Sequence, residues 1–387
     1  MIVCNTQELK YRLNQIKHFF VRNKQFPILN CVRINVKEIT YSNFDVTVRI
    51  PLSGEGDGVF MIPFPQLYEF VKDAQSSEIT IEGDKAGRVT VDNGADKLAP
   101  NDIFSPDDSL AVPVYDFNVA GAADAGQLRR VFSCYYAADT YDIRFNLDGV
   151  CIDVANRVIV ATDSHRLSLR GMNFTLQTDN LYVIPRFVAN GLLKLVNKSI
   201  DAVQFSCSES HSTWLQIRYR DVDLYVTCRD KYPEYQRVIP KDGALKLTFT
   251  NPLHAVAQLN DIKKRSHKLR TLAIKGYNTG MVRVATPNYK GILEGCTAHA
   301  DCIFTVNIKY LIECLKQFLG SRTPVTVWNT KDKTSPWLFK TEGSNDIDMI
   351  MPMRCDDAEA WFNNVRRKKR MANESADHAR LSPHTWG

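Results

Sequence analysis

Two adjacent polar side chains, Ser164 and His165, are the residues whose types could do covalent chemistry. A serine beside a histidine suggests a nucleophile with its general base, the pairing found in hydrolases. Adjacent residues on a strand or turn point in different directions, however, and a catalytic base must itself be oriented by a third group. The chain also has no Gly-x-Ser-x-Gly segment. A Ser/His hydrolase is therefore only a remote alternative.

The sequence contains no recognisable motif for binding nucleotides or metal ions. There is no Gly-x-x-x-x-Gly-Lys-Ser/Thr loop and no Gly-x-Gly-x-x-Gly turn. The eight histidines lack metal-ligand spacing, and the ten cysteines occur without a Cys-x-x-Cys pair. We therefore expect no cofactor, no metal and reduced, largely buried thiols.

Length and charge set broad limits on the class of protein. The 387 residues are 44% hydrophobic, which suits ordinary globular cores, and no apolar run approaches the roughly 18 residues of a membrane span. The N-terminal residues show no secretion signal, so we expect a cytoplasmic protein without membrane contact. The net charge of +6 is modest, so its distribution matters more than its sum.

The elements that would position these residues form a threefold repeat. Pro63, Pro185 and Asn307 are spaced 122 residues apart, and each follows a short apolar strand and opens a helical pattern. Apolar residues at +4, +7 and +8 from these positions lie on one helix face. They are Leu67, Phe70 and Val71, then Ala189, Leu192 and Leu193, then Leu311, Cys314 and Leu315. A repeat of this length is a whole domain, because solenoid units are only about 20–50 residues long.

A second helix precedes each of these, with strands after both. The apolar stripes of the leading helices are Leu9, Leu13, Ile16 and Phe20, then Leu128, Val131, Phe132 and Tyr135, then Leu253, Val256, Leu259 and Ile262. Strands are predicted at 32–36, 79–81, 89–91, 145–147, 150–154, 203–205, 214–217, 272–274, 282–284, 325–327 and 337–339. The pattern predicts an α+β fold of three tandem domains over 1–118, 119–241 and 242–355, followed by an extension over 356–387.

Positive charge gathers on the predicted helices. The leading helices and the loops after them carry Lys10, Arg12, Lys17, Arg22, Lys24, Arg129, Arg130, Lys263, Lys264, Arg265, Lys268 and Arg270. The trailing helices add Lys72, Arg186, Lys194, Lys198, Lys309 and Lys316. If the sheets lie side by side, the helices share one face, and that face would suit a phosphate backbone without sequence preference.

Five segments in this order carry a resemblance to a known family. They are Phe26-Pro-Ile-Leu29, Ala161-Thr-Asp-Ser-His-Arg-Leu167, Val183-Ile-Pro-Arg186, Tyr232-Pro-Glu-Tyr-Gln-Arg-Val-Ile-Pro240 and Met351-Pro-Met-Arg354. Together with the threefold repeat they resemble the β sliding clamp, the processivity subunit of bacterial DNA polymerase III, over residues 1–355. The resemblance implies that two chains close a ring, with helices on one face of antiparallel sheets lining the hole. It also implies a non-enzymatic function, which is to encircle duplex DNA and tether polymerase to it.

The resemblance places a partner-peptide pocket at the junction of the second and third domains. Its residues would be Leu147, Thr162, Ser164, His165, Arg166, Leu167, Pro233, Arg237, Val238, Asn307, Tyr310, Met349, Met351, Pro352, Met353 and Arg354. Leucine, valine and methionine would form an adaptable apolar cleft. The three arginines could orient peptide carbonyls or carboxylates.

Contacts to DNA and to partners follow from the same resemblance. The DNA-binding residues would be Arg22, Asn23, Lys24, Tyr141, Arg144, Phe145, Asn146, Arg186 and Phe187. The implied partners are double-stranded DNA, the replicative polymerase, other proteins with clamp-binding motifs and a second copy of the chain. A clamp-loader ATPase is also implied, because the chain has no ATP site with which to open a closed ring.

Two departures from the family's pattern stand out. Ser164 occupies a position where the family usually has glycine, so the turn or the pocket floor is expected to differ. The family also ends about where Met351-Pro-Met-Arg354 ends, whereas this chain continues over 356–387. We expect a short helix over 358–371, with Trp361, Phe362 and Val365 on one side, followed by a polar, disordered segment. The extension, which contains the basic run Arg366 to Arg370, could modulate access to the pocket, could add a contact to DNA, or could be a plain solvated tail.

An interaction module is the main alternative to a ring around DNA. A protein of the same fold could sequester clamp-binding partners without encircling DNA. Retention on circular but not on linear DNA distinguishes the two functions.

Overall fold

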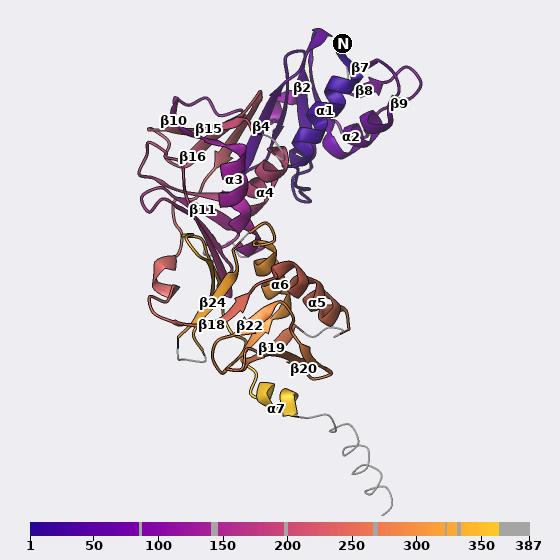
Figure 1. Ribbon diagram of the computed structural model, residues 1–387. Coiled ribbons are helices and arrows are strands. Elements are labelled where there is room, and N and C mark those ends of the chain that lie inside the picture. The colour runs from indigo at the N-terminus through magenta and orange to yellow at the C-terminus, as the bar shows by residue number, and fades with distance from the viewer. Residues whose placement is uncertain are drawn as a thin grey trace, which may run out of the picture. The chain divides into compact units, whose positions relative to one another are not determined.

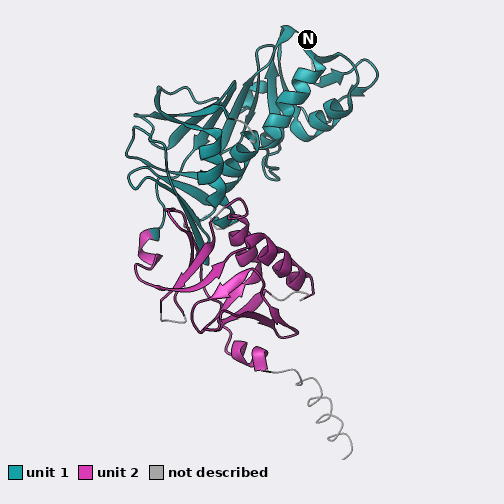
Figure 2. Ribbon diagram, viewed as in Figure 1, with its two compact units in different colours: residues 1–235 teal, residues 236–387 magenta. Residues whose placement is uncertain are grey.

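The computed structural model describes residues 1–84, 87–140, 146–196, 200–265, 270–321, 323–330 and 334–363. The chain divides into two compact units, residues 1–235 and 236–387 (Figure 2). Unit 1 contains the first predicted domain and nearly all of the second, and unit 2 contains the third. The division into three domains stays a prediction.

The described residues of unit 1 form four helices and three runs of antiparallel strands, which Figure 1 labels where there is room. The helices are α1 (Thr6–Lys17), α2 (Phe64–Asp73), α3 (Ala125–Phe132) and α4 (Arg186–Leu195). One sheet has the order β5 (Gly54–Gly56), β1 (Ile2–Asn5), β7 (Glu78–Gly83), β8 (Val89–Asp92) and β9 (Lys97–Leu98). A second has the order β10 (Phe117–Asp124), β15 (Ala202–Ser208), β16 (Trp214–Tyr219), β17 (Val222–Thr227), β4 (Val46–Pro51), β3 (Glu38–Ser42), β2 (Cys31–Asn35) and β6 (Val59–Pro63). The third run is β14 (Leu181–Pro185), β11 (Gly149–Asp153), β12 (Val158–Thr162) and β13 (Arg166–Gly171).

The second of these sheets joins strands of the first two repeats. β17 pairs with β4, so Leu224 lies opposite Val48 and Asp223 opposite Arg49. Asp223 also forms ion pairs, with Arg49 at 2.8 Å and with Arg218 at 2.6 Å. The ladder and these ion pairs explain why the two repeats form one compact unit.

The described residues of unit 2 form two longer helices and one short helix. They are α5 (Pro252–Arg265), α6 (Ile308–Lys316) and α7 (Ala358–Asn363). Its strands follow one another as β26 (Ile347–Ile350), β25 (Trp337–Thr341), β24 (Val325–Asn329), β18 (Ala244–Phe249) and β22 (Cys296–Ala298), and as β21 (Tyr289–Ile292), β20 (Val282–Thr286), β19 (Thr271–Gly276) and β23 (Cys302–Asn307). Short 3₁₀ helices also occur. In unit 1 they are η1 (Pro27–Asn30), η2 (Pro106–Asp108) and η3 (Ser133–Ala137), and η4 (Tyr235–Val238) begins at the last residue of unit 1.

The three trailing helices begin where the repeat places them. Pro63, Pro185 and Asn307 are the N-cap residues of α2, α4 and α6. The residues four positions later, Leu67, Ala189 and Leu311, are completely buried. The predicted helix faces are therefore confirmed.

Two local predictions were wrong. Leu253, assigned to the apolar stripe of α5, is 65% exposed, because the buried face of that helix runs through Ala255, Val256, Leu259 and Ile262. Asn146 and Leu147, predicted in a strand, lie in a turn in which Asn146 has a φ of 57°. Phe145 lies outside the described residues.

The C-terminal extension begins with α7, which packs on β20 and β19 (Figure 1). Lys290 Nζ donates a hydrogen bond to the carbonyl of Phe362 at 3.0 Å. Lys275 Nζ lies 3.6 Å from the carboxylate of Glu359. The helix predicted over 358–371 is observed over Ala358–Asn363, and Val365 and Arg366 to Arg370 lie outside the described residues. No helix in the described part of the chain is long and apolar enough to span a bilayer.

His18, which caps the C-terminus of α1, should make the stability of unit 1 depend on pH. Burial and the nearby ammonium groups of Lys194 and Lys17 lower the pKa of His18 below 6.5. The unfolded chain, with its unshifted pKa, therefore binds the proton more readily than the folded chain, and acid favours unfolding. Stability should fall as the pH drops from about 7.5 through 6.5 toward the lower folded pKa.

Thermal melts of His18→Gln at pH 7.5 and 5.5 test this expectation. The difference in Tm between the two pH values should be smaller in the variant than in the parent chain. An unchanged difference would show that His18 contributes nothing to the pH dependence.

Candidate partner and DNA sites

A tight turn between β12 and β13 organises the Thr162–Leu167 segment. The Asp163 carboxylate accepts hydrogen bonds from the backbone N–H groups of His165 and Arg166, both at 3.0 Å. Thr162 Oγ1 donates to the carbonyl of Arg166 at 2.6 Å. Aspartate favours turns because its carboxylate accepts hydrogen bonds from backbone N–H groups two and three residues later. The turn is therefore explained by the local sequence.

Arg166 is a buried part of this turn. Its Nε lies 2.9 Å from the Asp163 carboxylate, its guanidinium lies 5.2 Å from the centre of the Tyr136 ring, and the residue is only 6% exposed. Arg166 therefore stabilises this turn through its contacts with Asp163 and Tyr136. A direct bond from Arg166 to a peptide stays a prediction.

Ser164 and His165 are exposed at the tip of the turn. The Asp163 oxygens are bound to backbone N–H groups and to Arg166, so this carboxylate does not orient the His165 ring as a catalytic triad requires. No group of three or more His, Cys, Asp or Glu side chains in the described ranges could hold a metal. The geometry thus disfavours the hydrolase alternative.

Replacing Ser164 by glycine should stabilise unit 1. Ser164 has a φ of 69°, a left-handed conformation that costs a side-chain-bearing residue about 1–2 kcal/mol. Glycine removes that cost, but it also raises the conformational entropy of the unfolded chain, which lowers the free energy of unfolding by about 0.4–1 kcal/mol. We expect a net gain of about 0.5 kcal/mol in the free energy of unfolding, measured by urea denaturation.

Ser53→Gly is the matched control for this substitution. Ser53 is also exposed but does not have a positive φ, so its replacement should destabilise the protein slightly. Equal losses in both variants would contradict the strain assigned to Ser164.

The segment that follows β17 is tied to the same strands. The Tyr232 hydroxyl accepts a hydrogen bond from the N–H of Thr162 at 3.0 Å, and burial raises the pKa of Tyr232 well above 10. The Tyr235 hydroxyl donates to Asp153 at 2.8 Å. Both tyrosines fix this segment, which leaves Pro233 half-buried between them. Sequence reasoning did not assign roles to Tyr136, Tyr232 or Tyr235, because nothing local indicates which strand each would meet.

Leu147 also lies in unit 1, in the turn before β11. It is 7% exposed, and its carbonyl accepts a hydrogen bond from the N–H of Asp139 at 2.8 Å. Leu167, at the start of β13, is 1% exposed. These two predicted pocket residues are therefore mainly part of the packing of unit 1.

In unit 2, the Met351–Arg354 segment is held along β23. The N–H of Met353 donates to the carbonyl of Thr305 at 2.9 Å, and Thr305 Oγ1 donates to the carbonyl of Met353. Thr271 Oγ1 lies 3.5 Å from the Met353 sulfur. Thr271 also pairs with Asn307, so Met353 lies near the N-terminus of α6.

The other predicted pocket residues of unit 2 differ in exposure. Asn307, Tyr310, Met351 and Pro352 are half-buried, and Met349 is a core residue of β26 at 3% exposure. Arg237, Val238 and Arg354 are exposed. Unit 2 thus brings half-buried methionines together with the start of α6, a surface suited to an apolar peptide side chain.

The predicted DNA-binding residues fall into four groups. Arg22 and Lys24 are exposed in the loop after α1, and neither forms an ion pair with another described residue. The side chains of Asn23, Asn146 and Arg186 form hydrogen bonds within the chain. Asn23 accepts from the N–H groups of Gln25 and Phe26. Asn146 donates to the carbonyl of Lys231, and Arg186 donates to the carbonyl of Tyr135. Phe187 packs against the core. Tyr141, Arg144 and Phe145 lie outside the described residues.

Several helix cations are partly neutralised within the protein. Arg12 lies 2.6 Å from Asp221, Lys72 lies 3.3 Å from Glu69, and Lys309 lies 3.9 Å from Glu313. Lys17 donates to the Tyr68 hydroxyl at 2.9 Å. Any attraction of these helices to phosphate is therefore weaker than the count of lysines and arginines suggests.

Known proteins share both the sequence pattern and the fold. The β sliding clamp of Caulobacter vibrioides is 23% identical, over 88% of this chain and 96% of that protein. The DNA polymerase sliding clamp of Bacillus subtilis has a TM-score of 0.78 at 18% identity, covering 92% of this chain and 99% of that one. A sliding clamp from Bartonella birtlesii bound to griselimycin has the same TM-score and coverage at 21% identity. No family model matches the chain. The chain is therefore a divergent relative of the bacterial β sliding clamps and has their fold.

Proposed function

We propose that two copies of this chain close a ring around duplex DNA and confer processivity on a replicative DNA polymerase. The observation that carries the proposal is the likeness to β sliding clamps, which extends over 88% of the chain in sequence and 92% in fold. The threefold repeat supports it, because two chains of three similar domains supply six units for a closed ring.

The proposed ring acts by encircling DNA topologically and performs no covalent chemistry. A closed ring stays on DNA without tight contacts, so a few mobile contacts to phosphate suffice. Exposed Arg22 and Lys24 suit this role, and the partial neutralisation of Arg12, Lys72 and Lys309 suits sliding. We infer double-stranded DNA and a clamp-loader ATPase as partners, and the cytoplasm or nucleoid as the location.

Partners would be tethered through short peptides. We infer that the pocket uses the turn at Ser164, the half-buried methionines Met351 and Met353, and the start of α6. Half-buried methionines repack around different apolar side chains, which suits one site shared by polymerase and other proteins with clamp-binding motifs.

The mass of the protein in solution tests the assembly. Sedimentation equilibrium should give twice the 44.0 kDa mass of the chain. A protein that stays monomeric at micromolar concentration could not form a ring from three repeats. That result would favour the alternative of an interaction module that sequesters clamp-binding partners.

A further inference from the structure

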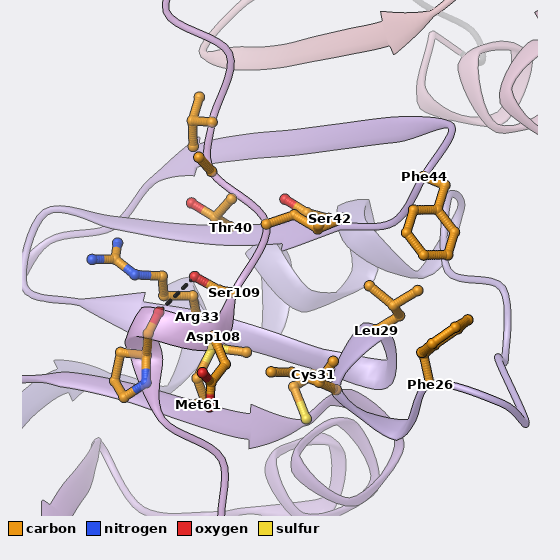
Figure 3. Close-up of a pocket in the computed structure, with 15 residues that line it drawn as sticks. Phe26, Leu29, Cys31, Arg33, Thr40, Ser42, Phe44, Met61, Asp108 and Ser109 are labelled. Atoms are coloured by element: carbon orange, nitrogen blue, oxygen red, sulfur yellow. Dashed lines mark hydrogen bonds between the residues drawn. The ribbon is translucent and has the colours of Figure 1, made fainter.

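Unit 1 contains a pocket of about 450 Å³ that the proposed function does not use. Its floor is formed by β6, β2 and β3, where Met61 lies opposite Arg33 and Arg33 opposite Thr40. The segment from Pro106 to Val112 crosses it, and Ser109 Oγ stabilises this segment by donating to the carbonyl of Pro106 at 2.7 Å. Figure 3 shows Phe26 and Phe44 at one end and Arg33 at the other.

The turn beside this pocket repeats the turn at Ser164. Asn43 Oδ1 accepts hydrogen bonds from the N–H groups of Asp45 and Val46, both at 2.9 Å, as Asp163 does for the residues two and three positions later. Ser42 and Phe44 thus occupy the positions of Thr162 and Ser164. The first repeat therefore builds, from its own residues, a counterpart of the turn expected to bind partner peptides.

Two hydroxyl groups in the pocket lack partners. Thr40 Oγ1 and Ser42 Oγ are buried and make no hydrogen bond with any described residue, and Thr40 is only 4% exposed. A buried, unpaired hydroxyl is unfavourable, and the cost is recovered when a ligand supplies the missing bond. In the second repeat the corresponding Thr162 hydroxyl, at the end of β12, donates to the carbonyl of Arg166, whereas Thr286 Oγ1, at the end of β20 in the third repeat, is also buried without a partner among the described residues.

The two ends of the pocket differ in chemistry. Phe26 and Phe44 are 50% and 58% exposed, and their rings meet edge to face with centroids 5.6 Å apart. Arg33 forms no ion pair with any described residue, although Asp108 also lines the pocket. An aromatic or leucine side chain fits the phenylalanine end, and a carboxylate fits the arginine end.

We propose that this pocket binds a short extended peptide of a partner protein, with one large apolar side chain and one acidic side chain. Peptide N–H and C=O groups would pair with Thr40 and Ser42, and the acidic side chain would pair with Arg33. The site does not depend on ring closure, so its failure would leave the proposed function in place.

A fluorescein-labelled hexapeptide, Gly-Asp-Leu-Phe-Ser-Gly, is the probe for fluorescence anisotropy. The host is the full chain carrying Met351→Ala and Met353→Ala, which removes the methionines of the other expected site. The host should bind the probe saturably, and Phe44→Ser and Arg33→Gln should each weaken binding at least tenfold. Thr40→Val should weaken binding while raising the Tm of the unliganded protein, a combination that a purely structural role would not produce.

Four outcomes would overturn the proposal. They are no saturable binding up to about 1 mM probe, unchanged binding in Phe44→Ser, a tenfold gain in affinity on deleting residues 364–387, and a halved solution mass in Phe44→Ser. The first two would exclude a peptide at this pocket. The third would identify the chain's own C-terminal segment as the occupant, and the fourth a second copy of the chain.

Discussion

Replacing Met351 and Met353 together by alanine should reduce the stimulation of a bacterial replicative polymerase to near the level without clamp. Both side chains are half-buried on the unit 2 surface near the start of α6. Truncating central apolar contacts of an interface costs about 2 kcal/mol or more, which is at least about 30-fold in affinity. Primer extension on primed circular DNA measures the loss.

The variant should otherwise stay intact. The bonds between Met353 and Thr305 involve the Met353 backbone, so alanine keeps them, and the solution mass should not change. Met281→Ala is the matched control, because Met281 is 39% exposed elsewhere in unit 2. Full stimulation by the double variant, or equal loss in Met281→Ala, would contradict the proposed site.

A single methyl group added at Gly191 should destabilise unit 1 by about 1–3 kcal/mol. Gly191 lies in α4, where a Cβ atom would come 2.7 Å from the carbonyl oxygen of His18 and 2.7 Å from the ring of Phe19. Phe19 is completely buried and cannot move aside without disturbing the core. The clash outweighs the gain of about 1 kcal/mol that alanine normally brings to a helix.

Gly320→Ala provides the comparison. A Cβ atom at Gly320 would meet no heavy atom within 4 Å, so urea denaturation should show little change. A loss below about 0.5 kcal/mol in Gly191→Ala would mean that α4 and the end of α1 are less closely packed than the structure shows.

The repeat could be predicted because it depends on sequence features that are local in the chain. Pro63, Pro185 and Asn307 are N-cap residues at a constant spacing, and the apolar residues after them follow the helical period. The turn at Asp163 also depends on local sequence, since its carboxylate accepts hydrogen bonds from the backbone N–H groups two and three residues later. These features depend on residues that are neighbours in the chain.

The environment of the site residues depends on distant partners. Arg166 is buried because Tyr136 and Asp163 enclose it, and Thr162 is held by Tyr232, 70 residues away. Leu253 followed the helical period but faces solvent, because the packing of α5 decides which side of its first turn is covered. Periodicity states which residues share a face; tertiary packing decides what that face meets.

Retention on DNA of different topology tests the central claim most directly. After loading by a clamp-loader ATPase onto a nicked plasmid, the protein should coelute with the circular DNA in gel filtration at high salt. Cutting the plasmid once should release it, because a ring slides off a free end. Equal retention on circular and linear DNA would show binding by contact alone and would contradict a clamp.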